Sequence, residues 1–359
     1  MGAGILRRSQ PLAPVGQRGS TYMKCVICPK NFITRREPMK MPTVASAVTK
    51  PMGENSAIAY IGDLESTRTL AQIAKHYVLL TKPTIMLLVL FTGATALILE
   101  GSFLSQPLNF FLVMLGLYLT GGSANALNQY FEREIDARMD RTARRRPLPM
   151  HHLSSRQALA FAILIGLVGV ALFAFFFNWL TAGLALGTLL FYSLFYTLWL
   201  KPYTWHNIVI GGAAGAMAPV GAWTAATGTL GLEPILLFLI IFLWTPPHFW
   251  ALALYCKDDY VKARLPMLPV VKGDAETVRQ ILVYSVILVL ISFAVYLAGA
   301  RWFYIIAALL MGLWLVKKGL DAARLRTEKS FRGLFGYSII YLFGLFGAMI
   351  LDRVIMHFW

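Results

Sequence analysis

Long apolar stretches alternate with short polar connections from about Tyr77 to the carboxyl end of the chain. Each stretch has roughly 20 residues, the length that a helix needs to cross the hydrocarbon core of a bilayer. Nine stretches are predicted to be spans, at about 78–99, 108–131, 157–177, 179–200, 206–226, 234–256, 281–299, 302–317 and 334–352. The pattern therefore predicts an all-α, polytopic membrane protein whose nine transmembrane helices form a bundle in contact with the lipid bilayer.

The composition supports the same class and sets one segment apart. The chain is 57% hydrophobic and 14% charged, which is not the composition of a soluble domain. Residues 1–70 contain no apolar span, and they are basic, with Glu37 as the only acid before Glu54. We predict a disordered amino-terminal extension there, followed by an intramembrane domain over residues 71–359. The basic, acid-poor composition is also typical of an organellar transit peptide.

Basic residues indicate how the bundle lies in the membrane. The connections after the second, fourth, sixth and eighth predicted spans carry lysine and arginine, whereas the other four contain only Arg301. By the positive-inside rule, the amino end is cytoplasmic and the carboxyl end is on the opposite side. The net charge of +16 therefore lies mostly on one membrane face. That face suits anionic lipid or a phosphorylated substrate, and without a soluble binding domain no nucleic-acid partner is expected.

Four oxygen-bearing side chains recur every four residues at the end of the second predicted span. They are Asn128, Glu132, Asp136 and Asp140. If the helix continues, they stack along one face, about 6 Å apart. Such oxygen ligands suit Mg²⁺, which commonly keeps positions open for substrate phosphates. The alternative is a solvated helix end whose carboxylates pair with Arg133, Arg138 and Arg141.

A second charged cluster lies at the end of the sixth predicted span. It contains Lys257, Asp258, Asp259 and Tyr260. The second and sixth spans run in the same direction, so both clusters meet the cytoplasmic interface. Together with Arg141, Arg145, Lys257 and Lys262, the acids could hold a diphosphate through bridging metal ions and direct cation contacts. The alternative is a set of ordinary interfacial charges.

His248 lies within the sixth predicted span, directly after Pro246 and Pro247. The two prolines interrupt regular hydrogen bonding, and the resulting kink is expected to direct His248 into the bundle interior. An ionisable side chain inside a membrane span is a candidate functional residue. The alternative is a neutral histidine that bonds a carbonyl freed by the prolines.

These motifs resemble those of the UbiA superfamily of intramembrane prenyltransferases, in the branch that farnesylates haem b. The resemblance covers about residues 77–352 and rests on several strings in the right order. They include Asn128 with Glu132, Asp136 and Arg141-Thr142, then Arg146-Pro147-Leu148-Pro149, Trp223 to Gly228, Pro246 to Ala253, Asp259-Tyr260 and Pro266 to Val271. The arginine run is one residue longer than usual, which leaves open whether Arg145 or Arg146 takes the role of the family's arginine.

The resemblance implies a UbiA-type bundle and a set of roles for named residues. The implied Mg²⁺ ligands are Glu132, Asp136, Asp140, Asp258 and Asp259. The implied catalytic residues are Asn128, Asp136, Arg141 and His248, with His248 near the porphyrin as an iron ligand or a proton handler. Farnesyl diphosphate and haem b are expected to contact Lys82, Asn128, Arg141, Arg145, Arg146, Lys257, His248 and Tyr260.

The implied reaction transfers the farnesyl group of farnesyl diphosphate to a vinyl group of haem b. Water then adds, giving haem O for the biogenesis of terminal oxidases. Haem A synthase is a candidate partner, and the expected location is a bacterial plasma membrane, with the mitochondrial inner membrane as the alternative. Another prenyl acceptor, such as a quinone precursor or chlorophyllide, is also compatible with the carboxylates. A cation carrier is disfavoured, because carriers place their carboxylates near the membrane midplane.

Overall fold

The computed structural model describes residues 69–358, with side chains described as far as Ile355. The predicted extension over residues 1–70 thus lies, apart from its last two residues, outside the described part of the chain. Within that part the elements are helical and no strand occurs, so the predicted all-α class is confirmed.

The first helices of the described chain are α2 (Leu70–Leu80), α3 (Pro83–Glu100), the 3₁₀ turn η1 (Ser102–Ser105), α4 (Pro107–Phe131), α5 (Arg133–Arg138), α6 (Asp140–Ala143), α7 (Ser155–Phe176), α8 (Trp179–Leu190), the π-helix η2 (Phe191–Leu200) and α9 (Lys201–Tyr203). They are followed by α10 (Asn207–Gly215), α11 (Met217–Thr227), α12 (Leu232–Tyr255), α13 (Lys257–Lys262), α14 (Leu268–Val271), α15 (Gly273–Ala294), the 3₁₀ turn η3 (Val295–Ala298), α16 (Trp302–Leu325) and α17 (Glu328–Phe358).

Nine helical segments within the described residues are long and apolar enough to cross a membrane. Three of them join consecutive elements: α8 with η2 and α9, α10 with α11, and α15 with η3. Large apolar side chains such as Leu164 and Leu167 on α7 and Leu310 and Leu313 on α16 are exposed. Lipid, rather than water, accommodates such a surface. The chain is therefore a multi-pass membrane protein, and the nine predicted spans are confirmed.

Some predicted boundaries differ from the observed ones. The first predicted span began near residue 78, but α2 ends at Leu80 and a new helix begins at Pro83. Lys82 between them has a left-handed backbone, with φ 53° and ψ 66°. The proline that follows disfavours the right-handed helical region for Lys82, so α2 cannot run on into α3. The span predicted at 281–299 begins earlier, at Gly273, because its first turns are charged and hydropathy alone excludes them.

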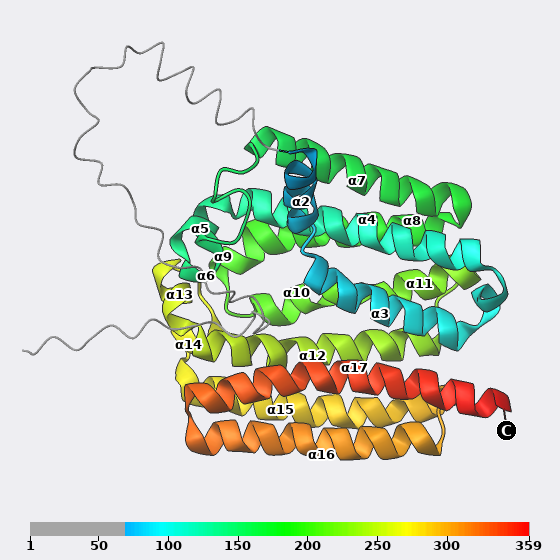
Figure 1. Ribbon diagram of the computed structural model, residues 1–359. Helices are drawn as coiled ribbons and strands as arrows, with labels where there is room; N and C mark the ends of the chain where they lie inside the picture. Colours follow the sequence, from blue (N-terminus) through cyan, green and yellow to red (C-terminus); the bar gives the residue numbers. More distant parts are fainter. Residues whose placement is uncertain (1–68, 359) are drawn as a thin grey trace, which may run out of the picture. The chain divides into compact units, whose positions relative to one another are not determined.

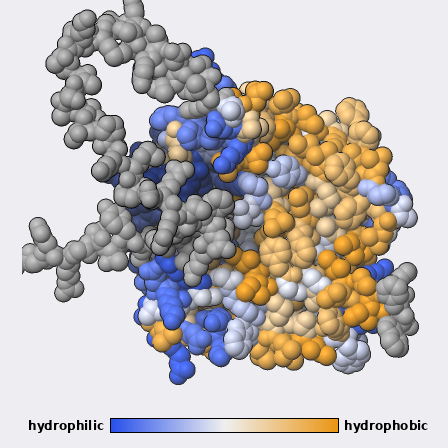
Figure 2. All heavy atoms as spheres, in the orientation of Figure 1, coloured by the Kyte–Doolittle hydropathy of each residue, from blue (hydrophilic) through white to orange (hydrophobic). Residues whose placement is uncertain are grey.

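The central helix of the bundle is α12, which packs against α10, α11, α15 and α17. On the other side of the bundle, α4 packs against α7 and α3. The short helices α5, α6, α9, α13 and α14 gather at one end (Figure 1). Figure 2 shows hydrophilic residues at that end and apolar residues over the middle of the bundle. The polar end is where both predicted charged clusters lie.

Candidate active site

The site begins where α4 ends. Glu132 closes this helix with φ −92° and ψ 5°, and α5 starts at the next residue. Met139 is extended, with φ −98° and ψ 123°, and separates α5 from α6. The predicted continuous ladder from Asn128 to Asp140 is therefore wrong in its last member, because the backbone turns away before Asp140.

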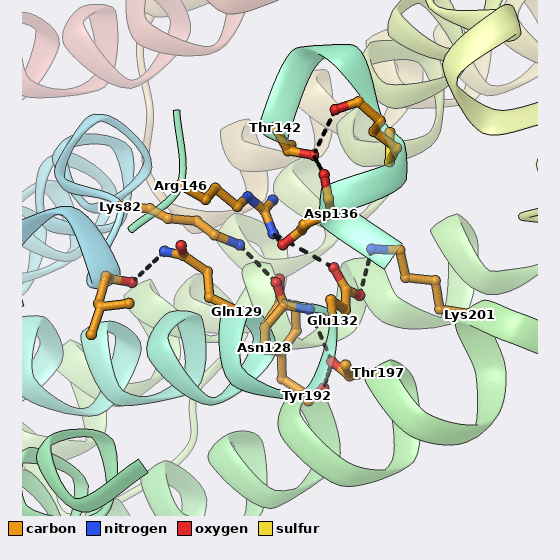
Figure 3. A network of polar contacts seen from close by, with 12 residues as sticks. Lys82, Asn128, Gln129, Glu132, Asp136, Thr142, Arg146, Tyr192, Thr197 and Lys201 are labelled. Atoms are coloured by element: carbon orange, nitrogen blue, oxygen red, sulfur yellow. Dashed lines mark hydrogen bonds and ion pairs between the residues drawn. The ribbon is translucent and has the colours of Figure 1, made fainter. Parts of the chain in front are cut away.

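Glu132 and Asp136 nevertheless remain together in a buried ion network. They are 3% and 2% exposed. Lys201 Nζ lies 2.5 Å from Glu132 Oε1, and Arg146 Nη1 bonds Asp136 Oδ2 and lies 3.8 Å from Glu132 Oε2. Figure 3 shows these side chains pointing toward one another from the junction of α4 and α5, from α5, from the loop after α6 and from α9. Two carboxylates of the predicted motif thus converge on one guanidinium nitrogen.

Asn128 extends the network by one turn into the membrane. Its Oδ1 accepts a hydrogen bond of 2.8 Å from Lys82 Nζ, and its Nδ2 donates to Thr197 Oγ1 at 3.2 Å. Thr197 in turn donates to the carbonyl oxygen of Tyr192 at 2.8 Å, a bond that spans five residues in the π-helix η2. The oxygen and the nitrogen of the Asn128 side-chain amide are therefore both held by hydrogen bonds to neighbouring elements (Figure 3).

Three basic side chains, those of Lys82, Arg146 and Lys201, face two carboxylates in this buried place. Burial and the nearby Arg146 guanidinium hold the pKa of Lys82 well below its usual value. Burial alone would raise the pKa of Glu132, but Lys201 and Arg146 outweigh it and lower that pKa. Burial raises the pKa of Asp136, although Arg146 opposes the shift. The excess of basic side chains over carboxylates suits the network to an anion such as a diphosphate, which would favour the charged form of Lys82.

The acids of the second cluster lie at the rim of this network. Asp259 Oδ2 accepts a hydrogen bond of 3.3 Å from the backbone N–H of Arg141, so α13 contacts α6. Asp140 is exposed and pairs with Lys262 at 2.6 Å, which lowers the pKa of Asp140. Asp258 is also exposed. The two predicted clusters therefore meet, but through their peripheral members.

The other residues predicted to contact substrate differ in whether they reach the buried network. Arg146 reaches the buried carboxylates, whereas Arg145 is exposed. Lys257 pairs with Asp274 of α15 at 2.7 Å rather than with Glu132 or Asp136. Tyr260 is buried, and burial raises its pKa. The alternative prediction of a solvated helix end is wrong for Glu132 and Asp136, which are buried and pair with Lys201 and Arg146, whereas Arg133 pairs with Glu134 at 3.4 Å.

Sequence reasoning missed two residues of the network, Lys201 and Thr197. Lys201 is the basic residue of the connection after the fourth span, and that position on the motif-bearing face was its only signal. Thr197 lies in the π-helix, which no hydrophobic period predicts. π-helical segments are frequent at functional sites, and here the segment places Thr197 beneath Asn128 and Lys201 beside Glu132.

His248 occupies the bundle interior, as predicted, and is 8% exposed. Its Nδ1 lies 2.7 Å from Ser338 Oγ on α17, so the predicted alternative of a bond to a freed carbonyl is wrong. The ring stacks between Trp244 and Phe335. No contact among the described residues joins His248 to the carboxylate network. The His248–Ser338 pair is therefore a separate buried polar site in the bundle.

The carboxylate network suits a magnesium ion by its donor chemistry. Glu132 and Asp136 already present oxygens to a single positive atom of Arg146, and the Asn128 amide oxygen lies one turn away. No three acidic, histidine or cysteine side chains converge on one point within residues 69–358. Proteins usually bind Mg²⁺ through one or two carboxylates plus substrate phosphates, which is the arrangement that these two acids allow.

Residues 88–340 match the sequence profile of the UbiA prenyltransferase family. The chain belongs to the UbiA prenyltransferase family. Curated relatives agree and cover most of the chain. The protoheme IX farnesyltransferase of Erythrobacter litoralis is 45% identical over 285 residues, which are 78% of this chain and 92% of the relative. That of Gloeobacter violaceus is 44% identical and covers 81% of this chain and 96% of the relative. The predicted intramembrane prenyltransferase and its branch are thereby confirmed.

Solved structures of this family share the fold. A digeranylgeranylglyceryl phosphate synthase superposes with a TM-score of 0.66 at 18% identity, over 79% of this chain and 99% of that one. A UbiA homologue from Archaeoglobus fulgidus, bound to DMAPP and Mg²⁺, superposes with a TM-score of 0.56 at 17% identity, over 76% of this chain and 98% of that one. The UbiA-type bundle predicted from the resemblance is therefore confirmed.

Proposed function

We propose that this UbiA-family chain transfers the farnesyl group of farnesyl diphosphate to a vinyl group of haem b, with addition of water, to give haem O. The observation that carries the proposal is the buried network of Glu132 and Asp136 with three basic side chains, in a chain 45% identical to an enzyme named protoheme IX farnesyltransferase. A cation-rich place at one end of an apolar bundle suits a substrate with a diphosphate head and an isoprenoid tail.

The diphosphate would bind Lys82, Arg146 and Lys201, exchanging their present partners for phosphate oxygens. Arg141 and Arg145 would contact it from the rim, and Lys257 and Tyr260 remain predicted contacts. Magnesium would be held by Glu132 and Asp136, with Asn128 beside them and with Asp140, Asp258 and Asp259 as ligands at the rim. When bound, the metal neutralises negative charge that develops on the departing diphosphate.

The chain's own residues then favour cleavage of the carbon–oxygen bond to the diphosphate. Cations that are fixed before the reaction stabilise the leaving charge without reorganising, which is commonly the largest catalytic contribution. The apolar interior keeps water from the allylic cation until the vinyl π electrons form the new carbon–carbon bond. The resulting porphyrin-conjugated cation takes up water and releases a proton. His248 is proposed to contact the porphyrin.

The same proposal includes the place of the reaction in the cell. Basic residues such as Arg144 and Lys262 are exposed at the end of the bundle that carries the network. By the positive-inside rule this end would face the cytoplasm, as would the amino end. We further propose the bacterial plasma membrane as the location, since the relatives named above are bacterial proteins. Haem A synthase is proposed as the recipient of the product.

The proposal is tested with purified protein in lipid, supplied with haem b, farnesyl diphosphate and Mg²⁺. Reversed-phase chromatography with mass detection should show farnesylated, hydrated haem. Asp136→Asn should lower the rate by at least about 100-fold, because it removes one of two buried carboxylates. Glu134→Gln is the matched control, since Glu134 lies on α5 but is exposed, and its rate should equal wild type. Prenylation of an aromatic acceptor in place of haem would contradict the proposal.

A further inference from the structure

Two side chains one turn apart on α12 both bond the same serine of α17. Trp244 Nε1 donates a hydrogen bond of 2.7 Å to the carbonyl oxygen of Ser338. His248 Nδ1 lies 2.7 Å from the hydroxyl oxygen of the same residue. Ser338 is fully buried. The seam between α12 and α17 thus contains a polar contact that the carboxylate chemistry does not use.

The partners of Ser338 decide which nitrogen of His248 carries the proton. The Ser338 hydroxyl donates its one hydrogen to the carbonyl oxygen of Phe335 at 2.7 Å. With that hydrogen given to the carbonyl, lone pairs of the hydroxyl oxygen face His248, and the tautomer that fits them carries its proton on Nδ1 and donates it. In the neutral ring, Nε2 consequently carries the free lone pair.

The orientation of the imidazole is fixed as firmly as its tautomer. Its two faces are covered by Trp244, with a centroid distance of 4.3 Å and an interplanar angle of 18°, and by Phe335, at 4.4 Å and 23°. The Nδ1 edge is held by Ser338, and rotation of the ring would separate that pair. Within the described residues, Nε2 has no hydrogen-bond partner, which leaves this edge for a ligand.

We propose that Ser338 is a positioning residue, which presents His248 Nε2 as an axial ligand to the iron of haem b. The inference rests on the proposed function, because it takes haem as the acceptor. Histidines that bind a metal usually donate their other N–H to a fixed acceptor, which sets the tautomer and raises the basicity of the ligating nitrogen. Haem iron accepts such an imidazole nitrogen. The iron-bound porphyrin would then be anchored at the α12–α17 seam.

The test is a titration of the purified full chain with ferric haem b, followed by absorption and electron paramagnetic resonance. Wild type should give the spectrum of a histidine-ligated haem, and His248→Ala should lose it. Ser338→Ala should bind haem about 10- to 100-fold more weakly with a shifted spectrum, and Ser338→Thr, which keeps the hydroxyl, should restore it. Ser285→Ala is the matched control, because Ser285 is equally buried on α15 but does not bond His248. A Ser338→Ala spectrum and affinity equal to wild type would overturn the inference.

A second measurement leaves Ser338 in place and does not depend on how its variants fold. In His248→Gly, added 4-methylimidazole can donate its N–H to Ser338 and ligate iron, whereas 1-methylimidazole has the same size but no N–H. The first should restore the haem spectrum at a lower concentration than the second, and equal restoration would overturn the inference. Production of haem O is measured separately: wild type that forms no farnesylated haem refutes the proposed function, whatever the spectra of the Ser338 variants.

Discussion

Glu132 is the residue on which the charge balance of the site depends. It is buried, and it lies between Lys201 on one side and Arg146 on the other. Burial of an unpaired carboxylate is costly, because the charged form loses its hydration. The two cations offset that cost and keep the pKa of Glu132 below its ordinary value of 4.5. The ionised side chain is thus part of the folded structure before substrate arrives.

Removal of Lys201 should show how far the folded state relies on a cation beside Glu132. Lys201→Met is expected to lower the free energy of unfolding by about 2–3 kcal/mol at neutral pH, because it leaves a buried carboxylate with one distant cation. Denaturant or thermal unfolding in detergent measures the change. Arg279→Gln is the control, since it breaks an exposed pair with Glu276, and it should change stability by less than about 1 kcal/mol.

The stability difference between wild type and Lys201→Met should depend on pH. A carboxyl whose pKa is depressed in the folded protein adds stability above its unfolded pKa and loses it as the pH falls through the folded value. Lys201→Met should raise the pKa of Glu132, because Lys201 is the strongest of the cations that lower it. The stability difference between wild type and variant should therefore begin to narrow as the pH falls to the pKa of Glu132 in the variant. It should stop narrowing once the pH is below the lower pKa of Glu132 in wild type. A difference that stays constant from neutral pH to below 4.5 would contradict this account of Glu132.

Residue spacing predicted Asn128, Glu132 and Asp136 as neighbours, because these positions follow the helical period up to the end of α4. It could not predict Lys201, which lies 69 residues away and reaches Glu132 only through packing of η2 against α4. Nor could it predict that Asp140 turns outward, because no proline or glycine marks the break at Met139 in the sequence. Contacts between distant segments are the part of the site that a local pattern does not contain.

Elements, unlike individual contacts, were largely predictable, since about 20 apolar residues in succession have few alternatives to a membrane helix. The exceptions have local causes. The π-helix η2 interrupts an apolar run without any change in hydropathy. The separation of α2 from α3 occurs at Pro83, a signal that is chemical rather than hydrophobic. The short helices α5, α6 and α13 carry charges that a hydropathy pattern assigns to connections.

The position of η2 depends on its close approach to α10. A Cβ atom added at Gly211 would overlap the ring of Tyr196, the neighbour of Thr197. Gly211→Ala should therefore displace η2, lower stability by about 1–3 kcal/mol and reduce the rate of farnesyl transfer. Gly215 lies on the same helix with open space around it, so Gly215→Ala should leave the rate unchanged and stability equal or slightly higher. Equal effects of the two substitutions in unfolding and turnover assays would argue against a role of this contact.

At the scale of the whole molecule, two buried polar sites within the described bundle bear on the proposed reaction. One is the cation-rich network at the end that carries α5, α6 and α13 (Figure 1), and the other is the His248–Ser338 contact in the seam between α12 and α17. The first suits a diphosphate and the second suits a metalloporphyrin. The central claim is that one protein brings these two substrates together within the bilayer.

The most direct test of that claim is the mass of the haem product formed in oxygen-18-labelled water. Wild type with haem b, farnesyl diphosphate and Mg²⁺ should give a haem that carries one farnesyl group and one labelled oxygen. Asp136→Asn and wild type with chelator should give neither. A farnesylated haem without labelled oxygen would contradict the proposed capture of the cation by water. Unmodified haem beside hydrolysed farnesyl diphosphate in the wild-type reaction would contradict the proposed acceptor.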